Sequence, residues 1–517
     1  MFIQILFFIF SMILTLLFFM YGFNHYYLIY ATSKYKKPPL PENFADRPKV
    51  SVHLPVYNER YVINRLIAAC AEMAESYGKE NVSIKILDDS NDDTVIEVDK
   101  IVEEYKQKHF NIEVMRRENR KGFKAGALQA ALEKTDEEFI AIFDADFIPA
   151  SDFLLRTVPY FAGNERLGIV QSRWTHLNRD YNRLTKAIGL GIDVHFLVEQ
   201  TGRYAAGCFQ NFNGSGGILR KKAIQEAGGW QSDTLAEDLD LSYRMQNRGG
   251  YRVLFLKDLL SPAEIPPTVP SYKKQQARWA CGSLRTAKKL LPEILHNRNL
   301  SFKQRLQAFI HLTGYMLHPM MLFSFLLLCM STIFDVNNVM MPDANPVLFL
   351  GDYQKMTSFP TAMVLQYLGE AILTIVIVLC SIAPTISMVV ALKTQKMSIP
   401  RNLISAIIAF LLGFGICSSN TVEAGKALLT SKVWEFSRTP KYAEIKNDQD
   451  RKNKKYQVSM DFSWILELIL ICLGVICIGI SIRNSNFFAL VTLIPYTCAF
   501  LFVLSLTIIQ TRKGKAR

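Results

Sequence analysis

Long apolar runs with almost no charged side chains alternate with charge-rich stretches along the 517 residues. Each run exceeds the roughly 20 residues that an α-helix needs to cross a bilayer. The runs occupy residues 1–33, 306–334, 362–392, 462–482 and 487–510. Their lengths and their lack of charge are typical of membrane proteins, so the pattern predicts five membrane-spanning helices.

Basic residues beside the apolar runs predict how the helices are oriented. Lys34, Lys36 and Lys37 directly follow the first run, and Lys and Arg are frequent in residues 426–455 and after Gln510. Cytosolic flanks of membrane helices carry an excess of Lys and Arg. We therefore expect an uncleaved N-terminal anchor that ends in the cytosol, with both later basic segments also in the cytosol.

A shorter apolar stretch at residues 403–418 decides how many helices cross the membrane. It is short for a span, and both basic segments lie in the cytosol only if this stretch does not cross. We expect residues 400–431 to form an amphipathic helix at the membrane interface. A sixth span is the competing interpretation.

Residues 48–305, between the first two apolar runs, have the pattern of an α/β domain. Short apolar segments predict strands, and longer segments predict helices between them. The predicted strands are residues 50–55, 83–87 and 139–143, and the predicted helices are residues 61–75 and 92–106. This alternation predicts a mostly parallel sheet with helices on both faces, and such sheets bind ligands at the carboxyl ends of their strands.

These patterns divide the chain into five regions. A transmembrane anchor is followed by a cytosolic domain, transmembrane helices, an interfacial helix with a cytosolic loop, and a transmembrane hairpin with a basic tail. The expected regions are residues 1–33, 34–305, 306–392, 393–461 and 462–517.

The charge balance narrows the class of partner. The net charge is +13, from 59 Lys and Arg against 46 Asp and Glu, which suits cytosolic flanks and pockets for nucleotide diphosphates. No basic stripe or nucleic-acid-binding motif occurs, so we expect no nucleic acid partner. The nine cysteines form no CxxC pair, and neither a zinc site nor a disulfide framework is supported.

Two acidic pairs follow predicted strands. Asp88 and Asp89 follow residues 83–87, where carboxylates accept hydrogen bonds from a base or ribose, although Asp also favours turns and helix caps. Asp144 and Asp146 follow the next predicted strand. Their hard oxygens suit Mg²⁺ or Mn²⁺ bridging a diphosphate, and an exposed acidic loop is the alternative.

Two further clusters carry candidate chemistry. Glu237 and Asp238 precede a helical stretch, where a carboxylate could deprotonate an acceptor hydroxyl or could merely favour the helix N-terminus. Gln275, Arg278 and Trp279 form a QxxRW string. Arg278 offers a planar donor fork for phosphate, and Trp279 offers a flat face for a sugar ring.

These four clusters, in this order, resemble the D, DxD, (T)ED and QxxRW signature of processive family 2 glycosyltransferases, which include cellulose, hyaluronan and chitin synthases. The resemblance covers nearly the whole chain. It implies a GT-A type mixed sheet inserted between transmembrane helices. It also implies an inverting hexosyltransferase that extends a polysaccharide from a nucleotide-diphosphate sugar and passes the product through its own channel in the lipid bilayer.

Shorter strings resemble the cellulose synthase-like A group, the glucomannan 4-β-mannosyltransferases, and their bacterial relatives. They are LPVYNE at 54–59, LDDSN at 87–91, NRKGFKAG at 119–126, QSRW at 171–174 and NGSGG at 213–217. One departure is Ala236, where the family often has Thr or Val, beside the expected base. This resemblance favours a β-1,4-mannan or glucomannan made from GDP-mannose and GDP-glucose.

Carried over position by position, the resemblance assigns roles to single residues. Those implied to bind the donor are Asp88, Asp89, Lys124, Asp144, Gln275 and Arg278. Those implied to bind the acceptor polysaccharide are Glu237 and Trp279. Asp144 and Asp146 would hold Mg²⁺ or Mn²⁺, and Asp238 would be the catalytic base.

A last segment, WEFSRTPK at residues 434–441, resembles the gating loop that closes over the donor in cellulose synthase. Phe436, Arg438 and Thr439 match its FxVT pattern, with Arg in place of Val. An ordinary basic loop beside the membrane is the alternative.

Other functions stay open at this point. The motifs do not distinguish GDP-mannose from UDP-glucose, so a β-glucan synthase is an alternative. A non-processive transferase to a lipid acceptor would share the acids. An inactive polysaccharide channel and a structural synthase subunit are further alternatives, and a synthase could have accessory subunits. The favoured location is a prokaryotic plasma membrane, or the Golgi for a plant-type relative, with the active site in the cytosol.

Overall fold

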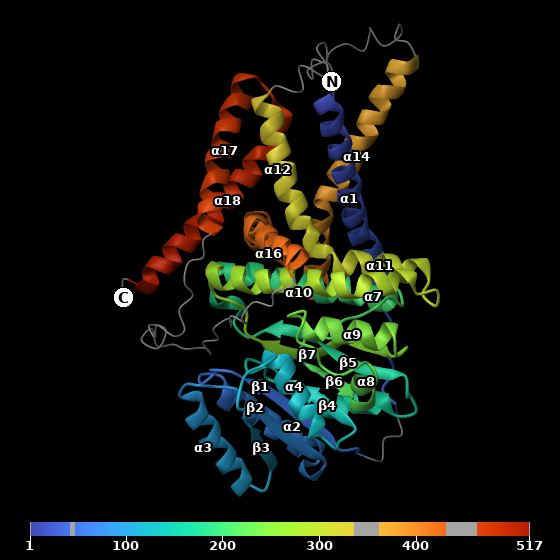
Figure 1. The fold of residues 1–517 in the computed structure, drawn as a ribbon, viewed down its shortest axis with the longest axis vertical. Coiled ribbons are helices and arrows are strands. Elements are labelled where there is room, and N and C mark those ends of the chain that lie inside the picture. Colours follow the sequence, from blue (N-terminus) through green and yellow to red (C-terminus); the bar gives the residue numbers. More distant parts are fainter. Residues whose placement is uncertain (1, 42–46, 335–360, 431–462, 516–517) are drawn as a thin grey trace.

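The computed structural model describes residues 2–41, 47–334, 361–430 and 463–515 of the chain. A seven-stranded sheet lies at one end, apolar helices stand at the other end, and several helices lie crosswise between them (Figure 1). Because of this arrangement, segments that are far apart in the sequence lie close together where the strands end.

The sheet has the strand order β3-β2-β1-β4-β6-β5-β7. Strands β1 to β4 run parallel to one another, β6 is antiparallel to β4 and β5, and β7 is parallel to β5. The strands are β1 (Val50–Val56), β2 (Val82–Asp88), β3 (Asn111–Met115), β4 (Phe139–Ile142), β5 (Leu167–His176), β6 (Gly217–Arg220) and β7 (Arg252–Ala263). The predicted mostly parallel, mixed sheet is therefore confirmed.

Helices cover both faces of this sheet. They are α2 (Ile63–Tyr77), α3 (Thr94–Gln107), α4 (Phe123–Glu133), α5 (Phe153–Thr157), α8 (Lys221–Glu226) and α9 (Glu237–Asn247). The three predicted strands and two predicted helices match β1, β2, β4, α2 and α3 within two residues at every end. Strands β3, β5, β6 and β7 were not predicted.

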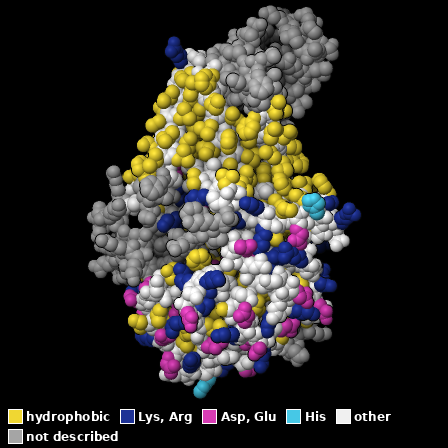
Figure 2. Space-filling view, in the orientation of Figure 1, with side chains coloured by type: hydrophobic (Ala, Val, Ile, Leu, Met, Phe, Trp, Pro, Cys, Tyr) yellow, Lys and Arg dark blue, Asp and Glu magenta, His cyan; other side chains and the backbone are white. Residues whose placement is uncertain are grey.

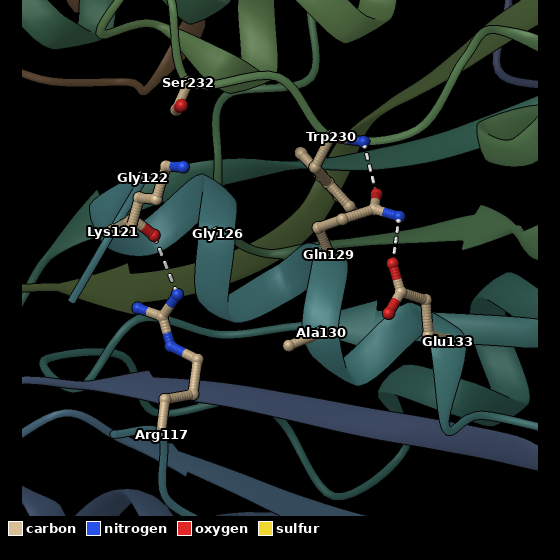
Figure 3. Close-up of a pocket in the computed structure, with 9 residues that line it drawn as sticks. All are labelled: Arg117, Lys121, Gly122, Gly126, Gln129, Ala130, Glu133, Trp230 and Ser232. Atoms are coloured by element: carbon tan, nitrogen blue, oxygen red, sulfur yellow. Dashed lines mark hydrogen bonds between the residues drawn. The ribbon is translucent and has the colours of Figure 1, made fainter. Parts of the chain in front are cut away.

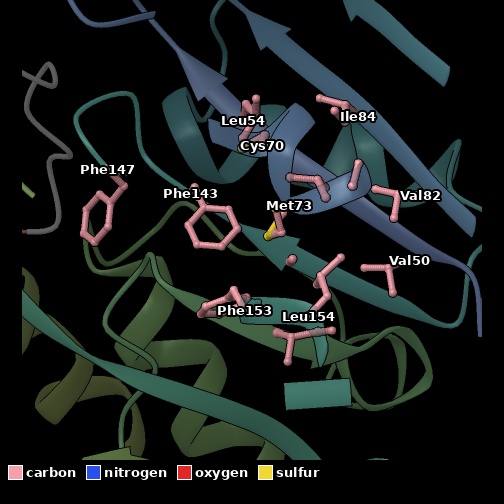
Figure 4. Packing of buried hydrophobic residues seen from close by; sticks show 14 of the residues in the cluster. Val50, Leu54, Cys70, Met73, Val82, Ile84, Phe143, Phe147, Phe153 and Leu154 are labelled. Carbon is pink, nitrogen blue, oxygen red and sulfur yellow. The ribbon is translucent and has the colours of Figure 1, made fainter. Parts of the chain in front are cut away.

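Alternate residues of the central strand β4 show how both faces are buried. Phe139 and Ala141 belong to the cluster formed with α2, α3 and α5, part of which is drawn in Figure 4. Ile140 and Ile142 belong to the cluster formed with α4, α8 and α9. Because neighbouring side chains of a strand point to opposite faces, a fully apolar strand buries both sides of the sheet.

Crosswise helices separate the sheet from the upright helices (Figure 1). They include α7 (Thr201–Ala205), α10 (Val269–His296) and α11 (Phe302–Leu312). Another helix, α6 (Arg183–Val194), continues through the π-helix His195–Gln200 into α7. Helices α6 and α10 are each apolar along one side. The QxxRW string lies in α10.

The remaining helices are predominantly apolar, except that residues 417–429 are more polar. They are α1 (Phe2–Thr32), α12 (Leu317–Ile333), α14 (Thr361–Thr394), α15 (Ile399–Gly415), α16 (Cys417–Leu429), α17 (Ser463–Arg483) and α18 (Phe487–Lys515). Within the residues that the structure describes, four segments are long and apolar enough to cross a membrane: Ile9–Thr32, Gly314–Ile333, Ser463–Arg483 and Ala489–Thr511. Figure 2 shows hydrophobic side chains over this part of the visible face and charged side chains over the sheet. The chain is thus built as a membrane protein.

The charge-free run at 306–334 is not one helix. Its first part belongs to α11, which ends at Leu312, and the candidate span begins at Gly314. Within α11, Gln307 donates to the Asn24 side chain at 2.6 Å, and His311 pairs with the Tyr243 hydroxyl at 2.7 Å. Buried polar groups of this kind need hydrogen-bond partners inside the protein. The prediction considered charged residues only, so it included this polar helix and began the span too early.

The ambiguous stretch near residue 410 also differs from a single helix. Helices α15 and α16 form a pair bent by 43°, which would supply one more span if the pair is a single span. Gly415 lies just before the bend, where an added Cβ would meet Val503 Cγ2 of α18 at 2.4 Å. The glycine therefore allows close helix packing at the bend.

Candidate active site

The carboxyl ends of β1, β2 and β4 meet at one edge of the sheet, because these strands run parallel. Asp88 is the last residue of β2, and Asp144 lies two residues beyond β4. The first two acidic clusters therefore reach the same edge, where open parallel sheets bind ligands.

Asp88 and Asp89 are each held by an arginine that follows β3. The Asp88 carboxylate is buried and accepts from Arg116 Nε at 2.9 Å and from the Ser90 amide at 3.0 Å. The Asp89 carboxylate accepts from Arg117 Nε at 3.1 Å and Nη2 at 2.5 Å. Bidentate pairs of this kind fix geometry as well as charge. Sequence reasoning missed both arginines because it did not predict β3.

Arg117 also shapes the loop that leads into α4. Its guanidinium donates to the backbone oxygens of Lys121 and Phe123 at 2.9 and 3.1 Å. Gly126 lets the chain pass closely, because an added Cβ would meet the Lys121 carbonyl oxygen at 2.1 Å. Figure 3 shows a pocket beside this loop, with Arg117 and Lys121 at one side and Trp230 across α4.

That pocket has a volume of about 330 Å³, and a second pocket of about 340 Å³ contains Asp89, Arg116 and Arg117. Neither pocket includes Asp144 or Asp238. Both lie beside the nucleotide end proposed from the sequence rather than around the expected base.

Lys124, in the first turn of α4, joins the second and third acidic clusters. Its ammonium group lies 2.6 Å from Asp144 Oδ1, 2.8 Å from the Gly214 carbonyl oxygen and 3.8 Å from Glu237 Oε1. Burial alone would lower the pKa of Lys124, but the carboxylates of Asp144, Glu237 and Asp238 outweigh it and raise the pKa. Lys124 is therefore a fixed positive charge among three acids.

Asp144 and Asp146 have different surroundings. Asp144 is half-buried, and its amide donates to Ser215 Oγ at 2.9 Å. Asp146 is buried, and its Oδ2 accepts from the Glu264 amide at 3.1 Å. No group of three or more His, Cys, Asp or Glu side chains suited to a metal ion occurs in the parts of the chain that the structure describes. Mg²⁺ is usually held by only one or two carboxylates together with phosphate oxygens of the substrate. Asp144 and Asp146 fit such a Mg²⁺ or Mn²⁺ site.

Asp238 has the electrostatics of a base that works near neutral pH. Burial and the neighbouring Glu237 carboxylate raise the pKa of Asp238 to about 7, against the opposing charge of Lys124. Its Oδ1 accepts from the Leu239 amide at 2.8 Å. General bases are most effective with a pKa close to the working pH.

The turn before α9 brings Glu237 and Asp238 under α10. Leu235 adopts a left-handed backbone with φ of 63°, and α9 then begins at Glu237. On α10, Gly282 faces Ala236 so closely that an added Cβ would meet the Ala236 Cβ at 2.7 Å. A small residue at 236, the departure noted in the sequence, therefore suits this contact.

Arg278 completes the convergence of the four clusters. Burial lowers the pKa of its guanidinium, and the charges of Glu237, Asp144, Asp238 and Asp146 act in the opposite direction. Four carboxylates from two separate clusters thus lie within electrostatic reach of the QxxRW helix. In the same helix, Gln275 is buried, and Trp279 is half-buried one residue beyond Arg278.

Gly214 carries a prediction of its own. It has φ of +79°, and an added Cβ would lie 2.8 Å from Asp238 Oδ2 and 3.3 Å from Lys124 Nζ. We expect Gly214→Ala to lower the sugar-transfer activity that the resemblance implies by about tenfold to a hundredfold, because small displacements of reacting groups have effects of this size. Initial rates with donor and acceptor, measured on purified protein, check it.

Gly207→Ala is the matched control, since Gly207 has φ of +66° and no atom within 4 Å of an added Cβ. Both variants carry a backbone penalty of about 1–2 kcal/mol, so the control shows the effect of this backbone strain alone. Equal activity losses in the two variants would mean that contact with Asp238 is unimportant.

The residues expected to form a gating loop, Phe436, Arg438 and Thr439, lie outside the described residues. All other sequence-predicted site residues lie at the strand edge, in α4, in the first turn of α9 or in α10.

Comparison with known protein families shows to which family the chain belongs. Residues 139–416, more than half of the chain, match the family described as glycosyl transferase family group 2. The chain belongs to this family. Residues 51–213 also match glycosyl transferase family 2. Together with the mixed sheet, this membership confirms the predicted α/β fold of GT-A type.

Curated relatives of this glycosyltransferase include plant proteins. It is 38% identical over 263 residues to a probable glucomannan 4-beta-mannosyltransferase 4 of Oryza sativa subsp. japonica, covering 50% of this chain and 47% of the relative. It is 38% identical over 265 residues to glucomannan 4-beta-mannosyltransferase 9 of Arabidopsis thaliana, covering 50% and 49%. The chain spans about half the length of the curated relatives it matches.

Among solved structures, one similar protein is a mannosyltransferase from Pyrobaculum calidifontis in complex with GDP-Man and Mn2+. The identity is 19% and the TM-score 0.48, over 72% of this chain and 98% of the other. The crystal structure of residues 1–349 of S. aureus TarS with UDP-GlcNAc has 17% identity and a TM-score of 0.36, over 51% of this chain and 72% of the other.

Proposed function

We propose that this glycosyltransferase is a processive, inverting polysaccharide synthase. It would add sugars from a nucleotide-diphosphate donor to a growing β-linked chain and pass that chain through its own membrane helices. One observation carries the proposal: Lys124 lies between Asp144 and Glu237, and the charges of these acids and of Asp238 act on both Lys124 and Arg278.

The proposed reaction follows from these groups. Asp238 takes the proton of the acceptor hydroxyl, whose oxygen attacks the anomeric carbon from the face opposite the donor phosphate. The bond from that carbon to the phosphate oxygen breaks, and the diphosphate leaves with the bonding electrons. Arg278 and Lys124 face the growing negative charge. A divalent ion on Asp144 and Asp146, when bound, supplies further positive charge for the leaving diphosphate.

Trp279 and Glu237 would bind the acceptor. Trp279 lies one residue after Arg278 on α10, where a flat aromatic face would support the sugar that receives the transfer. Glu237 precedes the base by one residue and would accept a hydrogen bond from an acceptor hydroxyl. Asp88, Asp89 and Gln275 would bind or position the donor.

We also propose the topology expected from the charges. The sheet region would lie in the cytosol, between an N-terminal anchor and the later helices, with residues 393–461 carrying an interfacial helix and a gating loop. The basic segments at residues 426–455 and after Gln510 would share the cytosolic side with the donor.

The favoured product is a β-1,4-mannan or glucomannan made from GDP-mannose and GDP-glucose. The names of the plant relatives support this choice, although each is matched over only about half its length. The carboxylates and the basic side chains of the site would contact the diphosphate of any nucleotide sugar, so they do not distinguish one donor from another.

One assay tests this proposal. Membranes containing the protein are incubated separately with radiolabelled GDP-mannose, GDP-glucose and UDP-glucose, and the product is digested with linkage-specific glycanases. We expect a long product from GDP-mannose that a β-mannanase degrades. A single added sugar on a lipid would refute processivity, and a product formed only from UDP-glucose would indicate a β-glucan. No transfer from any donor, when the assay is repeated with the purified protein, would support an inactive channel or subunit.

A further inference from the structure

A buried ion pair joins the site helix α10 to the apolar helix α17. Lys273 Nζ lies 2.6 Å from Glu467 Oε1 and 2.6 Å from Ser463 Oγ. The side chains of Lys273 and Glu467 are 3% and 0% exposed. The two partners are 194 residues apart in sequence, and Glu467 lies inside the candidate span Ser463–Arg483.

The chemistry of this pair argues against an incidental contact. Removing two charges from water costs several kcal/mol per ion, which close geometry and added hydrogen bonds must offset. Apolar residues would hold two helices together at lower cost. An ionisable residue within an apolar span therefore points to a requirement for defined geometry.

The place of Lys273 in α10 indicates which geometry is fixed. Lys273 precedes Gln275 by two residues and Arg278 by five on one continuous helix. The start of that helix has a second link to the membrane helices, because the Val269 amide donates to Gln510 Oε1 of α18 at 2.8 Å. The segment that carries the donor and acceptor groups is thus fastened at its beginning.

We propose that Lys273 and Glu467 are positioning residues that hold α10 in register with the membrane helices, so that Arg278 faces the donor diphosphate. Their ion pair couples the helices that would carry the polymer to the site that would extend it. This inference rests on the proposed transferase function, because the register of α10 affects nucleotide binding only if Arg278 contacts the diphosphate.

The test uses the full-length protein, purified in detergent, and two readouts. These are the Kd for the diphosphate of the donor found active, and kcat and KM for transfer. We expect Glu467→Gln to raise the Kd and the donor KM about tenfold or more, since a remote displacement of about 1 Å can cost up to a hundredfold. Size-exclusion profile and Tm report whether the variant is folded.

A double variant separates positioning from simple stability. Replacing both partners by methionine (K273M with E467M) removes the unpaired buried charge and should recover most of the lost Tm. We expect its Kd for the nucleotide to stay weak, because the directional link is absent. Reversing the pair (K273E with E467K) should recover part of the affinity.

Glu293→Gln is the matched control on the same helix. Glu293 pairs with Arg248, but these side chains are 41% and 46% exposed, and exposed pairs contribute little. We expect its Kd to stay within about twofold of the parent value. Unchanged affinity in Glu467→Gln, or full affinity in the double methionine variant, would overturn the positioning role. A parent protein without transferase activity on any donor would instead count against the proposed function.

Discussion

Asp238→Asn should remove sugar transfer almost completely while leaving nucleotide binding intact. The substitution keeps the shape of the side chain and removes its ability to take a proton. General-base catalysis contributes about 10²- to 10⁴-fold, so we expect kcat to fall by about that factor. Initial rates and nucleotide titration of the same preparation measure both effects.

The pH dependence sharpens this result. Burial and the Glu237 carboxylate raise the pKa of Asp238 to about 7. The base acts only when deprotonated, so the rate should rise between pH 6 and pH 8 and then level off. Because Lys124 lowers the pKa of Asp238, Lys124→Met should move the rising limb to higher pH.

Asp233→Asn is a suitable control for charge and location. Asp233 lies five residues before Asp238, is exposed, and pairs with Lys289 at 2.9 Å. Its loss should leave the rate and the pH profile unchanged. If Asp238→Asn kept the parent rate, or if the parent rate were flat between pH 6 and pH 8, another group would be the base.

The sequence was most informative where one local pattern determines one element. Strand β4 is a short apolar run that ends two residues before Asp144, so its position and its acidic loop could both be predicted. The same holds for β2 and Asp88. A local pattern does not show which distant segments meet. The resemblance to a known family, based on the order of the four motifs, predicted that these segments come together.

Other features depend on partners far away in the sequence. Glu467 lies in an apolar run that was read as an ordinary span, and only the position of Lys273 explains a carboxylate there. Similarly, the sequence marks Gly214 only as part of the NGSGG string, whereas the structure shows that it lies beside Asp238 and Lys124. Pairings of this kind leave no periodic signal, so the sequence could not reveal them.

Asp144→Asn tests the other half of the site. Asp144 neutralises Lys124 through a 2.6 Å contact and is the more accessible acid of the DxD pair. Metal-ion stabilisation is worth several kcal/mol, so we expect kcat/KM to fall by about a thousandfold. Two readouts are needed: transfer rates over a series of Mn²⁺ and Mg²⁺ concentrations, and Mn²⁺ binding followed by electron paramagnetic resonance in the presence of nucleotide.

The two readouts separate loss of metal from loss of the lysine contact. If Asp144 holds the ion, Asp144→Asn weakens Mn²⁺ binding, and chelation of the parent protein abolishes transfer until Mn²⁺ or Mg²⁺ is restored. Asp152→Asn, eight residues further along and exposed, should alter neither measurement. Normal Mn²⁺ binding with slow transfer would limit Asp144 to holding Lys124. Full activity after chelation would mean that Lys124 and Arg278 stabilise the departing diphosphate without an ion.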